Sequence, residues 1–356
     1  MMKIDKHIEI VRSSDSWLSS MSQLSCDNIF EVLNNTYSRV GVSIVNNLND
    51  LKRLVELKPD LVFLGMKFIP ADNTIYSQHS DKIWLADYLD EASIAYTGSN
   101  KLAQELDVEK SLAKRRVLDA GLTTSAYNVI GQYQKLVNYV LPPDLIFPVF
   151  IKPSNRGGGL GIDSKSIANN QAELKSKVKS ISKVLGSDSL IEEYLVGREF
   201  SVAILKYGNA PSLIAMPIEL VAEPDSSGSL VLSGEIKSAN LEKVSVIADS
   251  VLKSQICIFA LDVFSAIGGR DYGRIDIRLD RRGVPQFLEA NLMPSLIDNY
   301  GSFPKACHLN MGIGYKQMIL TITRLGLLRT EHPIEPAKTK DLISILATNY
   351  LVHGLV

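Results

Sequence analysis

The sequence predicts an α/β protein whose N-terminal part is a parallel sheet covered by helices. Strand-like and helix-like segments alternate over roughly the first hundred residues, and such alternation is typical of parallel sheets with helices on both faces. The chain has 356 residues, which is too long for one simple core and indicates two or three domains.

The N-terminal elements follow from the spacing of apolar residues. They are expected in chain order as strand 7–11, helix 26–37, strand 41–45, helix 48–58, strand 60–65, an irregular polar stretch 67–80, helix 81–92 and strand 94–99. In helix 48–58 the apolar residues recur at i, i+3, i+4 and i+7, which places them on one face.

The remaining elements continue the mixed pattern. They are expected as one helix 105–121 ending at Gly121, strand 147–153, helix 171–185, a strand–turn–strand 189–208, a long surface loop 219–243, helix 243–264, a hairpin 273–292 and a tail from about 330. A glycine just past the last helical turn is a common helix end. Loops as long as 219–243 are usually functional or disordered.

Composition excludes several classes of protein. The formal net charge is −1, so a global field for nucleic acid or an anionic membrane is absent. No apolar run reaches the length of a membrane span, and no signal peptide is apparent. The three cysteines lie far apart without a CxxC pair, which predicts neither a disulfide framework nor a zinc site. We therefore expect a cytoplasmic protein.

A glycine-rich loop is the first motif that suggests chemistry. The segment 151–163 reads IKPSNRGGGLGID, with Lys152 before the glycines. Glycine lets backbone N–H groups approach a ligand closely, which suits phosphate oxygens. The loop matches neither a Walker A sequence nor a Rossmann GxGxxG. A tight hairpin turn explains the glycines equally well when the loop is considered alone.

Two strands around a turn at 280–283 form the second motif. Alternation puts Arg274, Asp276 and Arg278 on one face and Ile275, Ile277 and Leu279 on the other. On the return strand Glu289 and Asn291 share a face, and we expect Arg274 to lie opposite Glu289. Carboxylate and amide oxygens without His or Cys suit Mg²⁺. The alternative is a solvated strand face with cross-strand ion pairs.

With these motifs in order, the chain resembles the ATP-grasp superfamily, and specifically its D-alanine–D-alanine ligase branch. The resemblance covers about residues 81–327 and rests on segments 94–124, 151–162, 192–205 and 273–295. It implies an ATP-grasp fold with an N-terminal Rossmann-like domain (1–100), a small central domain (101–185), a larger C-terminal domain (186–330) and a tail (331–356). ATP would bind between the central and C-terminal domains.

The resemblance also implies roles for individual residues. The phosphates of ATP would contact Lys110 and Lys152, with the loop residues Asn155, Gly157, Gly158 and Gly159 closing over them. The adenine would meet Glu192, Glu193, Tyr194 and Leu195, and the ribose would meet Glu199. One or two Mg²⁺ ions, for which Mn²⁺ could substitute, would be held by Asp276, Glu289 and Asn291. Arg274 would stabilise the oxyanion, and Lys237 in the long loop would reach the γ-phosphate.

The amino-acid end departs from the family pattern. The Ser-x-Glu element that binds the first substrate's ammonium is missing, and Asp15 is the nearest acid. The family's His-Gly…Gly-Glu-Asp-Gly loop is absent, and Ser238 stands where a tyrosine is expected. Ser295, and Asn299 or Tyr300, take the positions that receive the second substrate's carboxylate.

These features predict an ATP- and Mg²⁺-dependent ligase that joins an amino acid or small peptide carboxylate to an amine through an acyl phosphate. A specialised pathway is favoured over cell-wall synthesis, with a true D-alanine–D-alanine ligase as the first alternative. A catalytically silent nucleotide-binding partner or sensor is the second, and the Asp276, Glu289 and Asn291 set argues against it. We expect small-molecule substrates, a homodimer and no nucleic-acid or membrane partner. Of the basic run KSLAKRR, only Lys110 is expected at the site, and the others on a solvated helix face.

Overall fold

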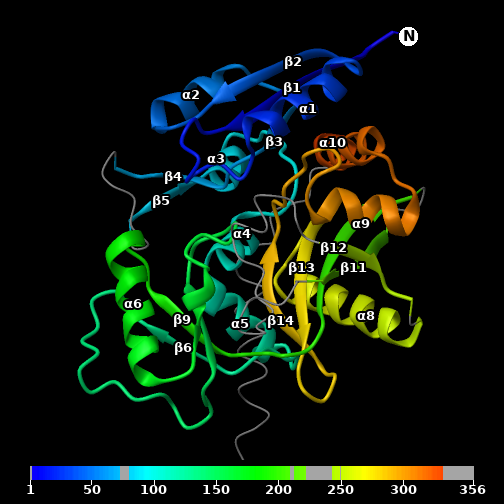
Figure 1. Ribbon diagram of the computed structural model, residues 1–356. Helices are drawn as coiled ribbons and strands as arrows, with labels where there is room; N and C mark the ends of the chain where they lie inside the picture. Colours follow the sequence, from blue (N-terminus) through cyan, green and yellow to red (C-terminus); the bar gives the residue numbers. More distant parts are fainter. Residues whose placement is uncertain (1, 73–79, 209–211, 222–242, 249, 332–356) are drawn as a thin grey trace, which may run out of the picture.

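The computed structural model describes residues 2–72, 80–208, 212–221, 243–248 and 250–331, and in these residues four β-sheets form the frame (Figure 1). The N-terminal sheet is parallel, with strand order β2-β1-β3. Its elements are β1 (Ile4–Arg12), α1 (Gln23–Asn34), β2 (Tyr37–Ile44), α2 (Leu48–Glu56) and β3 (Leu61–Leu64). The side chains of Ser22 and Asn47 cap the two helices by accepting backbone N–H groups. The predicted α/β alternation is confirmed.

The segment after β3 differs from the prediction. Residues expected to be irregular include β4 (Phe68–Pro70), which pairs with β5 (Lys82–Trp84), and α3 begins only after that strand (Leu85–Glu91). Phe68 and Trp84 pack edge to face with ring centroids 5.2 Å apart, so a tertiary contact fixes strands too short to show a period. The expected strand 94–99 is reduced to an isolated bridge between Val62 and Tyr96.

The predicted helix 105–121 is two helices. They are α4 (Lys101–Val108) and α5 (Lys110–Asp119), separated at Glu109, whose φ of −99° and ψ of 90° are not helical. The freed N–H of Lys110 donates to the carbonyl of Ser154 at 3.1 Å, so the break is compensated by a tertiary hydrogen bond. Gly121 has φ of +75°, as a helix-ending glycine requires.

A four-stranded antiparallel sheet follows, with order β6-β9-β7-β8. Its strands are β6 (Tyr127–Ile130), β7 (Val149–Pro153), β8 (Ile167–Ala168) and β9 (Ser189–Glu193), and α6 (Gln171–Leu185) packs against it through Leu174, Val178 and Ile181. A short 3₁₀ helix, η1 (Ser164–Ser166), precedes β8. Strand 147–153 and helix 171–185 are confirmed.

The largest sheet is antiparallel, with order β12-β11-β10-β13-β14. Its strands are β10 (Glu199–Tyr207), β11 (Ser212–Val221), β12 (Lys243–Val246), β13 (Tyr272–Leu279) and β14 (Pro285–Asn291), and it contacts α8 (Ser250–Ala266) and α9 (Ser302–Met311). The helix expected over 243–264 is wrong at its start, because Val244 pairs with Leu220 in β11 as an edge strand. The expected loop 219–243 begins inside β11, and its residues 222–242 lie outside the described residues.

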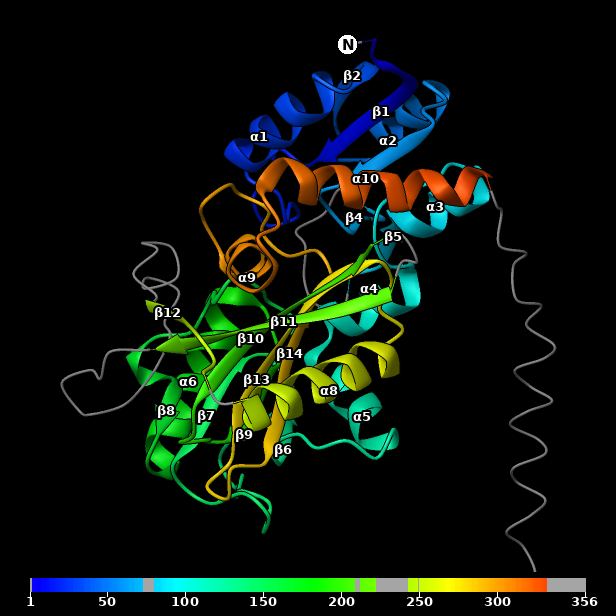
Figure 2. The same ribbon diagram turned by 90° about the vertical axis from the view of Figure 1, so that its right-hand side faces the viewer.

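Helix α10 (Tyr315–Glu331) joins the largest sheet's layer to the N-terminal sheet, since it contacts α9, α1 and β3 (Figure 2). Arg329 near its end forms an ion pair with Asp271 and donates to the carbonyl of Tyr96. The expected tail lies outside the described residues from 332 onward.

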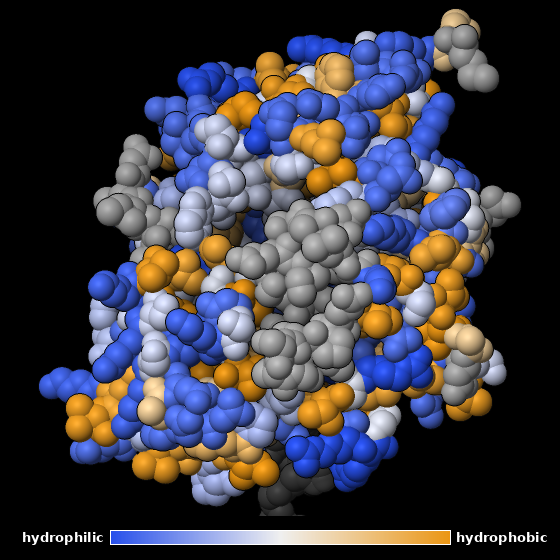
Figure 3. All heavy atoms as spheres, in the orientation of Figure 1, coloured by the Kyte–Doolittle hydropathy of each residue, from blue (hydrophilic) through white to orange (hydrophobic). Residues whose placement is uncertain are grey.

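The outer surface is mixed in character. On the face seen in Figure 3, apolar residues lie in small groups among polar ones. None of the helices in the described part of the chain combines the length and apolar character that crossing a bilayer requires. All three cysteines are free, and burial raises the pKa of Cys307 to about 12, as suits a packing role.

Candidate active site

A pocket lies where the four-stranded sheet meets the largest sheet. Its walls come from β7 and β9 on one side and from β10, β13 and β14 on the other. The lining residues are Ser125, Phe150, Lys152, Ile162, Glu192, Glu193, Tyr194, Leu195, Glu199, Asp276, Arg278, Leu288 and Glu289. The structure thus brings together most of the residues assigned to nucleotide and metal from the sequence. Phe150, Ile162 and Leu288, which add apolar wall, were missed because apolar residues at pocket positions resemble core residues.

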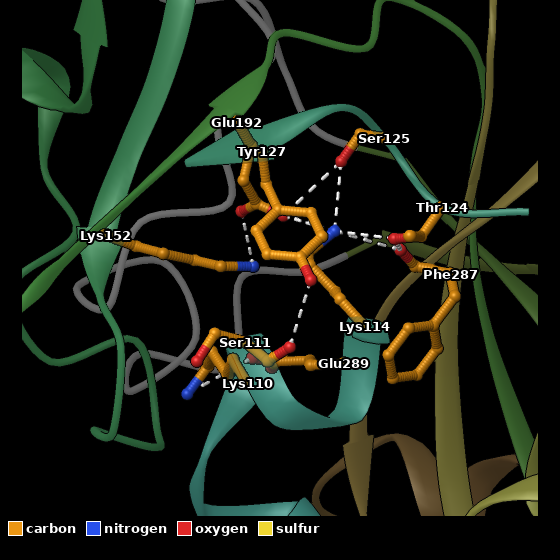
Figure 4. Close-up of polar contacts among 10 residues, drawn as sticks. All are labelled: Lys110, Ser111, Lys114, Thr124, Ser125, Tyr127, Lys152, Glu192, Phe287 and Glu289. Carbon is orange, nitrogen blue, oxygen red and sulfur yellow. Dashed lines mark hydrogen bonds and ion pairs between the residues drawn. The ribbon is translucent and has the colours of Figure 1, made fainter. Parts of the chain in front are cut away.

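A buried cluster of charges forms the back of this pocket (Figure 4). The carboxylate of Glu192 lies between two ammonium groups, with Nζ of Lys114 at 2.6 Å and Nζ of Lys152 at 2.8 Å. All three side chains are at most 6% exposed. Lys114 was expected on a solvated face, and that expectation is wrong. Its position four residues after Lys110, on the same helix face, is the signal that could have found it.

The surroundings of these groups shift their proton affinities. Burial alone would raise the pKa of Glu192, but the neighbouring ammonium groups of Lys114 and Lys152 outweigh it and lower that pKa. Burial lowers the pKa of Lys114 despite its carboxylate partner. For Lys152, the attraction of Glu192 and Glu289 overcomes burial and the pKa is raised. The cluster therefore keeps Glu192 ionised beside a charged Lys152.

The lowered pKa of Glu192 predicts a pH dependence of stability. A carboxyl group with a depressed folded pKa stabilises above its unfolded pKa, about 4.3, and loses that contribution as the pH falls through the folded value. Glu192→Gln should therefore unfold at a lower temperature than the wild type near neutral pH, and the difference should shrink in acid. Thermal unfolding of both proteins between about pH 3 and pH 8 measures this. A difference that stays constant across this range would contradict the assignment.

The glycine-rich loop follows β7 and precedes η1. Gly158 and Gly159 have φ of +64° and +76°, a region that favours glycine, and a Cβ added to Gly157 or Gly158 would meet no atom within 4 Å. Open space beside a backbone of this kind fits the expected phosphate loop. Asn155 lies deeper, where its Oδ1 accepts the hydroxyl of Ser187 at 2.8 Å.

Lys110 lies at the other side of this loop. Its ammonium donates to the carbonyl of Arg156 and lies 3.8 Å from Oε2 of Glu289. Burial lowers the pKa of Lys110, with Glu289 opposing the change. The first residue of α5 thus connects the glycine-rich loop to the β13–β14 hairpin.

The hairpin carries the expected acidic face with a different register. The isoleucines Ile275 and Ile277 are buried in the core as predicted, and the turn closes at Gly283. However, Arg274 pairs with Asn291, and Asp276 pairs with Glu289. The prediction that Arg274 lies opposite Glu289 is therefore wrong.

Two shifts of one residue each add up to the difference: beside the turn Leu279 pairs with Pro285 instead of Val284, and further along β14 carries a β-bulge. Asp276 pairs with Glu289 while Ile277 pairs with Phe287, so Leu288 is the extra residue of β14. Leu288 was expected on the face of Ala290 and Leu292, and that expectation is wrong, because Leu288 lines the pocket while those two residues pack into the core. Phe287, on the other side of the bulge, packs into the core as well. Bulges break the alternation of side chains, and nothing in a single strand's pattern announces them.

Asp276 is the centre of the polar contacts on this face. Its carboxylate accepts hydrogen bonds from Nε and Nη2 of Arg274 at 2.9 and 2.8 Å. It also accepts hydrogen bonds from the hydroxyl of Ser201 at 2.8 Å and from Nδ2 of Asn291 at 3.3 Å. Glu289 lines the pocket beside it with 22% of its side chain exposed. Two carboxylates and an amide oxygen match the ligands of Mg²⁺. Among the described residues, no three His, Cys, Asp or Glu side chains group as a metal site, so the fit depends on Asn291.

Comparison with known proteins follows this geometry. A sequence profile described as D-ala D-ala ligase C-terminus matches residues 117–324, more than half of the chain. The chain belongs to the D-alanine–D-alanine ligase family. The family consists of ATP-dependent ligases that form an amide bond, which confirms the predicted superfamily, fold class and enzyme class of this ligase.

Individual relatives add detail. An uncharacterized protein, y4sG, of Sinorhizobium fredii is 31% identical over 58% of this chain and 60% of its own length. A D-alanine–D-alanine ligase of Desulfotalea psychrophila is 24% identical over 91% of this chain and 96% of its own. The fold is similar to that of the Bacillus anthracis D-alanine–D-alanine ligase complexed with ATP, with a TM-score of 0.70 at 20% identity, covering 92% of this chain and 99% of that one.

The residues expected at the amino-acid end either lie outside the described residues or do not line this pocket. Lys237 and Ser238 lie outside the described residues. Ser295 and Tyr300 are half-buried in the segment between β14 and α9, and neither lines the pocket. The carboxylate of Asp15 accepts the backbone N–H of Trp17 at 2.9 Å and so serves its own turn.

Proposed function

We propose that the ligase uses ATP to activate a carboxylate other than that of D-alanine and joins it to an amine in a specialised pathway. The observation that supports this proposal most is the contrast between the two ends of the site. The nucleotide end gathers Lys152, Glu192 and Glu199 with the acidic hairpin in one pocket. At the amino-acid end the guanidinium of Arg156 lies over the ring of Trp17, 5.6 Å from its centroid, and Asp15 is engaged in a turn.

The charges at the amino-acid end support a donor unlike D-alanine. A substrate ammonium is stabilised by a carboxylate, and the acid nearest in sequence already accepts a backbone hydrogen bond. Arg156 adds a positive charge at the edge of the glycine-rich loop. An uncompensated ammonium costs about 1–3 kcal/mol or more on closure. The donor carboxylate is therefore proposed to lack a free α-amino group or to carry its charge elsewhere.

Within the site, the chain's own residues bind and orient. Lys110 and Lys152 are proposed to fix the phosphates, and Glu199, paired with Arg278 at 3.3 Å, to meet the ribose. Asp276, Glu289 and Asn291 are proposed to hold Mg²⁺, which neutralises phosphate charge when bound. Arg274 is proposed to stabilise the oxyanion formed when the amine attacks the acyl phosphate.

A true D-alanine–D-alanine ligase is the second candidate, and the names of several relatives favour it. A screen of amino acids and small acids in pairs, followed by ADP release and product mass, separates the two. D-Alanine alone should be turned over poorly, with a specificity constant below about 10⁴ M⁻¹s⁻¹. A relative named D-alanine–D-alanine ligase, assayed in parallel, is the positive control. Turnover of D-alanine above that value would establish the second candidate, and a lack of ADP release with every pair tested would favour the silent nucleotide-binding protein.

A further inference from the structure

Lys114 is a fully enclosed cation that reaches three separate segments of the fold. Its Nζ donates to Oγ1 of Thr124 at 2.7 Å and to Oγ of Ser125 at 3.0 Å, and it forms the ion pair with Glu192. A longer contact of 3.4 Å reaches the carbonyl of Phe287 in β14. The side chain is 0% exposed, so it cannot contact a ligand in the pocket.

We propose that Lys114 is a positioning residue that fixes Glu192, and through it Lys152, for nucleotide binding. The proposal rests on the proposed function in that the ligand is ATP. Glu192 presents one carboxylate oxygen to each lysine. The oxygen that contacts Lys114, Oε1, also accepts a hydrogen bond from the hydroxyl of Ser125 at 3.4 Å. In Figure 4 the two ammonium groups approach the carboxylate from different directions. A carboxylate fixed on one side by Lys114 holds the Lys152 ammonium in one place on the other.

Lys114 also ties the two walls of the pocket together. Residue Thr124 bridges to Phe287 in β14, with its hydroxyl donating to the Phe287 carbonyl at 2.6 Å. Glu192 belongs to β9 on the opposite wall. Because one ammonium group contacts both, the separation of the two sheets at the back of the pocket depends on it. Leu288 and Glu289, which line the pocket, follow Phe287 directly.

The charges of this cluster allow a test in which one substitution offsets the destabilisation caused by another. Two buried lysines share one carboxylate, so removing Glu192 leaves two ammonium groups near each other without the carboxylate that contacts both. Removing Lys114 as well leaves a single cation, Lys152. The double variant Lys114→Met/Glu192→Gln should therefore be destabilised less than the sum of the two single variants.

The experiment uses the full-length ligase, and binding of a non-hydrolysable ATP analogue is measured by calorimetry in the presence of Mg²⁺. Lys114→Met should weaken binding by about tenfold or more at temperatures where it remains folded. Arg115→Met is the matched control, because it removes a cation from the same helix at a side chain that is 72% exposed. It should bind like the wild type. A purely structural role for Lys114 would lower the unfolding temperature and leave the affinity unchanged, which would overturn the proposal.

Thermal unfolding without nucleotide provides the independent measurement. A double variant whose loss equals the sum of the singles would also overturn the proposal. If Lys114→Met does not fold, Ser125→Ala removes one of its hydrogen bonds and keeps every charge, and it should weaken binding in the same direction by a smaller factor. Unchanged binding in Ser125→Ala and in Thr124→Val would then count against the proposal. If the wild type binds no ATP analogue, the proposed function is wrong. Thermal unfolding of the single and double variants still tests whether Lys114 and Glu192 are coupled.

Discussion

Replacing Glu289 with Gln is expected to lower turnover by more than about 100-fold while the protein stays folded. Glu289 pairs across the hairpin with Asp276 and lies 3.8 Å from the ammonium of Lys110. The substitution preserves size and removes one negative charge from the proposed Mg²⁺ ligands. Turnover is measured as ADP release with the donor found by the screen, over a titration of Mg²⁺.

The matched control is Glu219→Gln in the same sheet. Glu219 pairs with Arg198 at 2.7 Å, and that arginine is 47% exposed, so the pair contributes little to stability. This variant should keep wild-type turnover. Near-normal ADP release in Glu289→Gln at low Mg²⁺ would refute the metal assignment. Recovery of the variant at high Mg²⁺ would support it, because a weakened site fills at higher concentration.

The second large effect is expected on stability. Arg329→Met should destabilise the fold by about 3 kcal/mol or more, because it removes the cation from a buried pair. Its partner Asp271 is 6% exposed, and Arg329 itself is 16% exposed. The guanidinium groups of Arg270 and Arg329 also lie 5.0 and 5.9 Å from the ring centroid of Tyr96. Chemical denaturation measures the loss, with Arg53→Met, which removes an arginine whose side chain is 70% exposed, as the control.

A second substitution should restore much of that loss. Asp271 has φ of +63°, a region that Asn also tolerates, so Asp271→Asn removes the charge without new backbone strain. In the Arg329→Met background it removes the unpaired buried carboxylate. The double variant should therefore be more stable than Arg329→Met alone. Equal or lower stability would show that packing of the arginine, and not its charge, is what α10 contributes.

The sequence predicted several of the parts of the fold whose pattern is local. Helix α6 has the bounds expected for it, and the alternation of Ile275 and Ile277 with Arg274 and Asp276 placed the faces of β13 correctly. Strands β4 and β12 were missed because each is short and depends on a partner distant in sequence. The α4–α5 break at Glu109 was missed for a similar reason, since a carbonyl in another element compensates it.

The site shows the same division. Its charged residues could be named from motifs, and the pocket gathers most of them. The partner of Arg274 could not be predicted, because it depends both on how the turn closes and on one bulged residue. Lys114 was missed because a lysine in a basic run is usually solvated, and only the fold shows the enclosure by Glu192 and Ser125. The domain boundaries and the homodimer stay predictions.

The bulge at Leu288 separates the residues of β14 that pack into the core from a residue that only lines the pocket. In a regular strand, side chains alternate between two faces, so each residue lies either in the core or on the side of the site. Here Phe287 and Ala290 keep their core partners, Glu289 keeps its partner Asp276, and Leu288 has no partner across the strand. A substitution at residue 288 should therefore change the pocket wall with little effect on the core. The strand thus has one position where the pocket wall can be changed while the acid beside it keeps its partner across the hairpin.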